Sequence, residues 1–155
     1  MRSAIGLLVA VLAAGEDQAA TVTAVPASGD AAHPATLGAA RRSADERSIG
    51  WTIALPIATT SYPIPVTLVV FTDGRLLRIP IGQMIHAWAF TADGTGVLIV
   101  HGTTHGPYPR TVERRSLATG AIAQTFTEAV DPDNRALEHQ DVPVWAEGVL
   151  EARAQ

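Results

Sequence analysis

Short apolar runs bounded by Gly, Asp and Pro fill the middle of this chain and predict an all-β fold of short strands. Residues 66–71 and 97–100 are almost continuously apolar, which is typical of strands that are covered on both faces. Residues 112–117 are mostly polar and predict an outer strand. The predicted strands are residues 37–42, 48–55, 66–71, 75–80, 85–90, 97–102, 111–117 and 121–126.

Turn signals separate these strands. The Asp-Gly pairs at 73–74 and 93–94 predict tight hairpins, because Gly accepts a positive φ and Asp caps a turn. Residues 45–47 (Asp-Glu-Arg) hold the corresponding place before the strand at 48–55. This segment lacks the Gly, so a weaker turn is predicted there.

The middle of the chain reads as two copies of one pattern. Ser-Ala-Asp at 43–45 recurs as Thr-Ala-Asp at 91–93, and Thr-Thr…Pro-x-Pro at 59–65 recurs at 103–109. A repeat of this length is typical of a β-rich blade or a solenoid module. The predicted units are residues 35–82 and 83–127, each with four antiparallel strands.

The C-terminal part, residues 128–155, has a different character. A loop is predicted first, and then a short helix over residues 144–153 with Pro143 at a tolerated position before it. Trp145 and Val149 share one face of this helix, and that face is predicted to pack on the sheets.

The N-terminal part is predicted to direct export. A basic residue, the apolar run at 4–14 and the small residues after it are typical of a secretory signal peptide at 1–20. Residues 21–34 are rich in Ala, Thr, Ser, Gly and Pro and predict a linker. The protein is therefore predicted to be periplasmic or secreted. The alternative is a buried N-terminal helix in a cytosolic protein.

Composition excludes several classes of protein. The formal net charge is −4 and no basic cluster exceeds a pair, which argues against nucleic-acid binding. Cysteine is absent, which excludes disulfides, thiol catalysis and zinc sites built on Cys. No second apolar run could span a bilayer, so an integral membrane protein is not predicted. No Gly-rich phosphate loop is present, and no cofactor is predicted.

A family resemblance rests on the second unit. Residues 90–99 (Phe-Thr-Ala-Asp-Gly-Thr-Gly-Val-Leu-Ile) resemble the blade motif of WD-type and TolB-type β-propellers, and residues 117–122 look like the second hairpin of such a blade. Residues 49–126 are similar to a group of uncharacterised exported bacterial proteins with propeller-like repeats. The resemblance implies no enzymatic role. Propellers close with about four to eight blades, so two units imply a sandwich, a fragment or closure by self-association into a homo-oligomer.

Histidine spacing raises one catalytic hypothesis. His101 and His105 could bind zinc if the turn between them brings the two imidazoles together. The alternative is one buried histidine and one loop histidine that bonds to backbone. His86 shares strand parity with Trp88 and Phe90, which favours a hydrogen-bonded core histidine.

The paired Thr-Thr…Pro-x-Pro loops form the predicted binding site. If the two units stack alike, both loops emerge at one end and present Tyr62, His105, Tyr108 and Arg110. The predicted function is an exported, non-catalytic binding or scaffold module for a protein or a small molecule. The alternatives are a small metal-dependent envelope hydrolase that uses His101 and His105, and an assembly protein whose open sheet edges recruit further copies.

Overall fold

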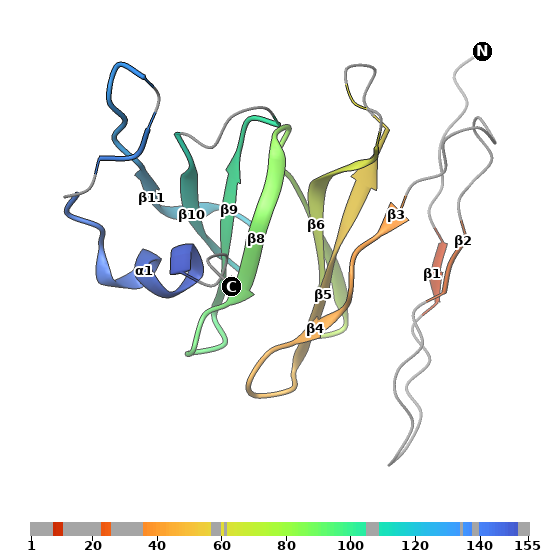
Figure 1. Ribbon diagram of the computed structural model, residues 1–155. Helices are drawn as coiled ribbons and strands as arrows, with labels where there is room; N and C mark the ends of the chain where they lie inside the picture. Colours follow the sequence, from red (N-terminus) through yellow and green to blue (C-terminus); the bar gives the residue numbers. More distant parts are fainter. Residues whose placement is uncertain are drawn as a thin grey trace.

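In the described part of the chain, the computed structural model consists of short antiparallel strands and one C-terminal helix, as the hydrophobic pattern predicts (Figure 1). No helix in the described part of the chain is long and apolar enough to cross a membrane. The described residues are 8–10, 23–25, 36–56, 60, 62–104, 109–133, 135–137 and 140–151. The elements are β1 (Leu8–Ala10), β2 (Thr23–Val25), β3 (Thr36–Leu37), β4 (Arg41–Arg42), β5 (Ser48–Leu55), β6 (Ile64–Thr72), β7 (Arg75–Pro80), β8 (Met84–Phe90), β9 (Gly96–Gly102), β10 (Thr111–Ser116), β11 (Ile122–Thr127) and α1 (Val144–Glu151).

Two antiparallel sheets form the body of the molecule, which confirms the all-β prediction. Sheet 1 has the order β3-β5-β6-β7, and β4 also pairs with β5. Sheet 2 has the order β8-β9-β10-β11. A small pair, β1 with β2, lies beyond β3 in Figure 1. Apart from these two strands, the predicted signal peptide at 1–20 and linker at 21–34 lie outside the described residues.

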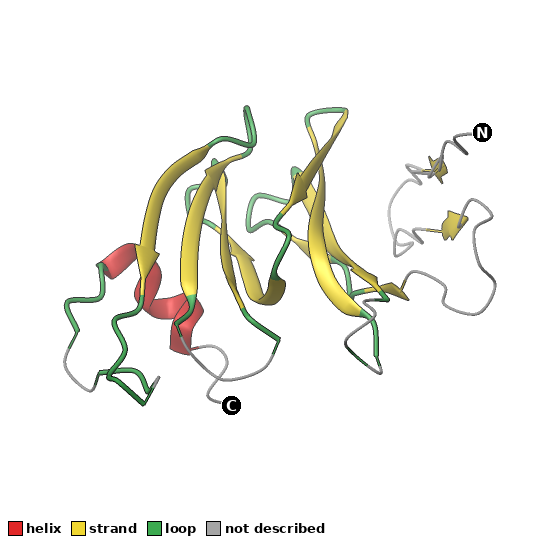
Figure 2. Cartoon of the chain, turned by 90° about the horizontal axis from the view of Figure 1, so that it is seen from above, coloured by secondary structure: helices red, strands yellow, loops and turns green. Residues whose placement is uncertain are grey.

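The main core lies between the two sheets, which stand side by side in Figure 2. Leu68 and Val70 of β6 point toward sheet 2, and Val97 and Ile99 of β9 point toward sheet 1. All four side chains are fully buried. Alternation along each strand sends one set of side chains into this core.

The apolar run of β6 is covered on both faces, as predicted. Val69 is fully buried on the opposite face of sheet 1 from Leu68 and Val70, and it belongs to a second cluster with Trp51 and Ile53 of β5. The register supports this arrangement, because Trp51 pairs directly with Val69.

The helix covers the far face of sheet 2. Ala146 and Val149 of α1 are buried against Val100 of β9 and Val112 of β10. The helix therefore adds a third layer, as the shared face of Trp145 and Val149 predicts.

Two details differ from the sequence-based expectation. The first strand, expected at 37–42, is split into β3 and β4, because the weak strand formers between them interrupt pairing with β5. The predicted outer strand at 111–117 is β10, which lies inside sheet 2 between β9 and β11. Its polar side chains are tolerated there because they pair with one another: Arg115 donates to the buried carboxylate of Glu113 at 2.7 Å.

Candidate functional site

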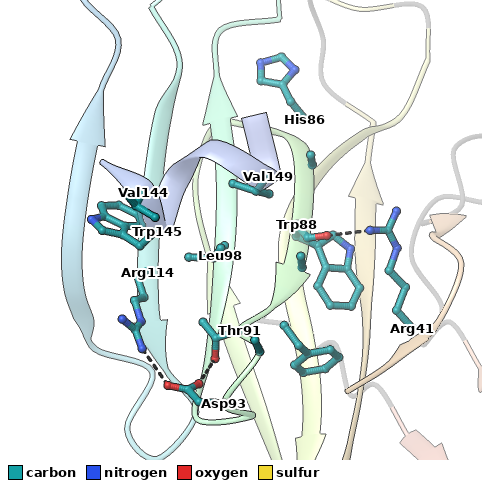
Figure 3. Close-up of a pocket in the computed structure, with 15 residues that line it drawn as sticks. Arg41, His86, Trp88, Thr91, Asp93, Leu98, Arg114, Val144, Trp145 and Val149 are labelled. Carbon is teal, nitrogen blue, oxygen red and sulfur yellow. Dashed lines mark hydrogen bonds and ion pairs between the residues drawn. The ribbon is translucent and has the colours of Figure 1, made fainter. Parts of the chain in front are cut away.

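A cleft of about 660 Å³ lies where α1 crosses sheet 2 beside β8 (Figure 3). β8 and β9 form its floor, α1 forms a wall, and the turn between β8 and β9 borders one end. Aromatic and charged side chains both reach it, from both sheets and from the helix. The residues that give it this character are Arg41, Trp88, Phe90, Asp93, Arg114 and Trp145.

The apolar part of the cleft arises from alternation along β8. Ala87 and Ala89 face α1, whereas Trp88 and Phe90 face the core between the sheets. The rings of Trp88 and Phe90 meet edge to face, with centroids 5.4 Å apart. Because the two alanines are small, the helix and the strand leave a hollow between them. Trp145 from α1 lies half-buried at its wall.

Arg41 reaches the cleft from sheet 1. In the register of β4 with β5, Arg41 pairs with Gly50. Its Nη1 donates a hydrogen bond of 2.7 Å to the main-chain carbonyl of Trp88, and its guanidinium lies 5.3 Å from the centre of the Trp88 ring. No acidic side chain in the described part of the chain forms an ion pair with Arg41. The guanidinium thus keeps its positive charge available to an anion.

Gly50 gives the indole ring of Trp88 its place beneath Arg41. A Cβ atom at this position would lie 2.9 Å from Cη2 of Trp88 and 3.2 Å from the carbonyl oxygen of Val69. Neither neighbour can yield easily, because one is a packed ring and the other is main chain. The absence of a side chain at residue 50 therefore positions this wall of the cleft.

Asp93 borders the other side of the cleft, and both of its carboxylate oxygens accept hydrogen bonds. Its Oδ1 accepts hydrogen bonds from the Thr91 hydroxyl, from the Thr95 hydroxyl at 2.8 Å and from the Thr95 N–H at 3.0 Å. Its Oδ2 accepts from Nη2 of Arg114 at 3.0 Å. The Thr91 hydroxyl is the largest cause that lowers the pKa of Asp93 from 3.8 to about 2. Asp93 is therefore ionised and paired at neutral pH.

The turn between β4 and β5 has the same hydrogen bonds as the turn between β8 and β9. The Ser43 hydroxyl donates to Oδ1 of Asp45 at 2.6 Å and accepts from the Ser48 N–H at 3.0 Å. In the second turn, the Thr91 hydroxyl accepts from the Gly96 N–H at 2.9 Å. The short hydroxyl side chain bridges each turn to the strand that follows it.

The two turns also touch each other. Glu46 adopts φ 61°, although it is not a glycine, at the position that Gly94 takes in the second turn with φ 68°. A Cβ atom on Gly94 would lie 2.9 Å from Oδ2 of Asp45. This close approach and the positive φ together favour a glycine at residue 94.

A second hollow of about 210 Å³ continues along β8, and Arg41 and Trp88 line both hollows. The register between β8 and β9 skips His86, which is therefore the extra residue of a β-bulge. The bulge explains why His86 lies half-buried beside the hollows instead of taking the core position predicted next to Trp88 and Phe90.

Two of the four residues of the predicted paired loops, Tyr62 and Arg110, belong to the described part of the chain, and they differ in exposure. Tyr62 is 52% exposed. Arg110 donates from Nε and Nη2 to both carboxylate oxygens of Glu128, at 2.7 and 2.5 Å, and both side chains are mostly buried. His105 and Tyr108 lie outside the described residues. The donors of Arg110 that face Glu128 are therefore taken by a structural ion pair.

The predicted metal ligand His101 is buried between the sheets. Its Nδ1 lies 2.7 Å from Oε1 of Gln83, and its Nε2 lies 3.4 Å from Oε1 of Glu113 without forming a hydrogen bond. Its predicted partner His105 is outside the described residues. Across the residues that the structure describes, no group of three His, Asp or Glu side chains is placed to hold a metal ion.

Sequence reasoning missed the cleft because its residues come from distant segments. Arg41, Trp88 and Arg114 belong to three different strands, and Trp145 belongs to the helix. One local signal pointed to it: Ala87 and Ala89 alternate with two aromatic residues, a pattern that leaves space on one face of a strand.

Comparison with known proteins found no matching family model, no matching curated protein and no matching solved structure.

Proposed function

We propose that the protein is a non-catalytic binding module, and that its ligand combines an anionic group with an apolar or aromatic body. The observation that carries this proposal is the position of Arg41. Its guanidinium lies over Trp88 at the edge of a cleft with a partly apolar lining, with a carbonyl and a ring as its neighbours. Concave apolar surfaces with a few converging polar groups are the usual form of ligand sites, and Trp and Arg are enriched among binding hot spots.

Binding is favoured over catalysis by the state of the carboxylate in the cleft. A general acid or base needs a pKa near the working pH and a free oxygen toward the substrate. The pKa of Asp93 is lowered to about 2, and both of its oxygens accept hydrogen bonds inside the protein. Asp93 therefore serves to hold the turn and to orient Arg114.

The cleft is a better candidate than the paired loops. Two donors of Arg110, one of the predicted loop residues, are occupied by Glu128. Arg41 in the cleft has only uncharged partners among the contacts described above. An anionic ligand therefore gains more binding free energy from Arg41 than from Arg110.

We further propose that the two sheets are two copies of one propeller-like unit in an exported protein. The matching hydrogen bonds of the turns at 43–48 and 91–96 support the duplication. The pattern of residues 1–20 supports export.

A small aryl carboxylate tests the proposed site. We expect 2-naphthoate to bind, to shift the amide resonances of Ala89 and Val149 in NMR spectra, and to quench tryptophan fluorescence. Arg41→Ala should weaken its binding about tenfold or more, because a charge-assisted hydrogen bond contributes about 1.5–3 kcal/mol.

Arg42→Ala is the matched control. Arg42 is the neighbouring residue on β4, it is exposed, and alternation points it to the other face of sheet 1. This variant should bind 2-naphthoate like the unaltered protein. Equal binding by the unaltered protein and Arg41→Ala, or resonance shifts confined to residues outside the cleft, would refute the proposed site.

A further inference from the structure

The edge of β8 lacks the charged side chains and prolines that usually protect an edge strand. Proteins shield exposed edges with charged side chains and prolines, because unpaired N–H and C=O groups invite another strand. β7, at the edge of sheet 1, carries Arg75, Arg78 and Pro80. β8, at the edge of sheet 2, consists of Met-Ile-His-Ala-Trp-Ala-Phe and carries no Asp, Glu, Lys, Arg or Pro.

The main chain of β8 offers groups at Trp88 and Phe90 to such a strand. In an antiparallel pair, alternate residues direct both main-chain groups toward the partner strand. The Thr91 N–H donates to the Gly96 carbonyl in the β8–β9 hairpin. By alternation, the main-chain N–H and C=O groups of Ala87 and Ala89 also point toward β9. Trp88 and Phe90 therefore point their main-chain groups away from β9.

Arg41 occupies the position from which a partner strand would donate a hydrogen bond to the Trp88 carbonyl. Its Nη1 already donates to the outward carbonyl of Trp88 at 2.7 Å. The two hollows lie along β8 and share Arg41 and Trp88, so that together they form a groove beside the strand. β11, the other edge of sheet 2, is also uncharged. What distinguishes β8 is this groove and the cation within it.

The positive charge of Arg41 favours a partner strand that carries an acidic side chain. Arg114 is paired with Asp93, whereas Arg41 has only the carbonyl and ring of Trp88 as its partners among the described contacts. A carboxylate accepts a stronger hydrogen bond from a guanidinium than a neutral carbonyl does. An acidic side chain opposite Trp88 would therefore attract Arg41 and free the Trp88 carbonyl for a strand.

We propose that an extended peptide segment of a partner protein, with an acidic residue, adds as a strand to the edge of β8 between Ala87 and Phe90. Its N–H groups pair with the outward carbonyls of β8, and Arg41 turns from the Trp88 carbonyl to the acidic side chain. The bulge at His86 limits the pairing at one end. This inference rests on the proposed function, since it names the ligand class of the same cleft.

Capped pentapeptides of alternating Thr and Val, with Asp placed at each position in turn, provide the probe. We expect at least one of them to bind and to shift the amide resonances of Trp88 and Phe90 in NMR spectra. The matching Asn peptide should bind about tenfold more weakly, the ratio that one charge-assisted hydrogen bond supplies. This preference should vanish in Arg41→Ala and persist in Arg42→Ala.

Backbone methylation of the peptide separates strand addition from other binding modes without altering the protein. N-methyl groups on alternate amides block pairing on one edge of the peptide and leave the other edge free. One of the two methylation patterns should abolish binding and the other should be tolerated. Equal binding by both patterns would overturn strand addition.

Three further outcomes are decisive. If 2-naphthoate binds the cleft and no acidic pentapeptide does, the proposed function stands and strand addition fails. If neither probe binds, both proposals fail. If light scattering shows a dimer whose Trp88 and Phe90 amides resist exchange without peptide, a second copy of the chain fills the edge, and the peptide proposal is overturned.

Discussion

The non-glycine residue in the turn between β4 and β5 gives a sharp test of the turn geometry. Glu46 has φ 61°, whereas Gly94 has φ 68° at the matching place in the turn between β8 and β9. A side chain in the left-handed region costs about 1–2 kcal/mol. Glycine loses more freedom on folding, which costs about 0.5–1 kcal/mol. Glu46→Gly should therefore stabilise the protein by about 0.5–1 kcal/mol.

Thermal and urea denaturation followed by circular dichroism measure this difference. The midpoint of Glu46→Gly should rise by about 2 °C, since 1 kcal/mol corresponds to about 2–4 °C in a chain of this size. Glu46→Ala is the control, because it removes the same exposed side chain and keeps the strain of a positive φ. It should gain no stability.

The reverse substitution tests the same reasoning in the second turn. Gly94→Ala adds a Cβ atom 2.9 Å from Oδ2 of Asp45 and imposes strain at φ 68°. It should destabilise the protein by about 1 kcal/mol or more. The reasoning is refuted if Glu46→Gly is no more stable than Glu46→Ala, or if Gly94→Ala unfolds at the same urea concentration as the unaltered protein.

Three further predictions concern a buried ion pair, the carboxylate of Asp93 and the histidine expected from the sequence to bind a metal. Arg110→Ala leaves the buried carboxylate of Glu128 without its cation and should cost about 3–5 kcal/mol in urea unfolding; a loss below about 1 kcal/mol would contradict the structural role of this pair. The pKa of Asp93 is lowered from 3.8 to about 2, chiefly by the Thr91 hydroxyl, so its contribution to stability is complete above 3.8 and is lost as the pH falls through about 2. Asp93→Asn should lack this part of the loss of stability in acid. An identical dependence of the unfolding free energy on pH in both proteins would argue against this contribution. Excess EDTA should leave the melting midpoint unchanged, because Nδ1 of His101 contacts the Gln83 side chain and no group of three His, Asp or Glu side chains among the described residues is placed to hold a metal ion; a drop that zinc alone restores would instead favour the metal-dependent hydrolase.

Strand positions could be predicted because their signals are local. Apolar runs and Asp-Gly turns mark β6, β7, β8 and β9 within a few residues of their observed bounds. The Asp-Gly turn before β7 is confirmed in detail, since Asp73 and Gly74 both have positive φ.

The place of β10 in its sheet could not be predicted in the same way. Polarity along a strand indicates exposure only when its polar groups meet water. Glu113 and Arg115 meet each other, and His101 lies beside the same carboxylate. Such compensation depends on a neighbouring strand, which the local pattern does not specify.

The cleft could not be predicted from local sequence patterns for a related reason. Arg41 lies in sheet 1, and its contact with Trp88 exists only because the two sheets pack face to face. The helical face that carries Trp145 and Val149 was predictable from spacing alone, but the hollow beneath it depends on which strand it meets.

The core between the sheets has a consequence for how the molecule unfolds. Each sheet is a meander of hairpins and could in principle form alone, but Leu68 and Val70 of one sheet share an apolar cluster with Val97 and Ile99 of the other. Separating the sheets would expose these four side chains together. The two sheets should therefore open as one cooperative unit, and the slowest-exchanging amide protons of β6 and β9 should report the same free energy, that of global unfolding.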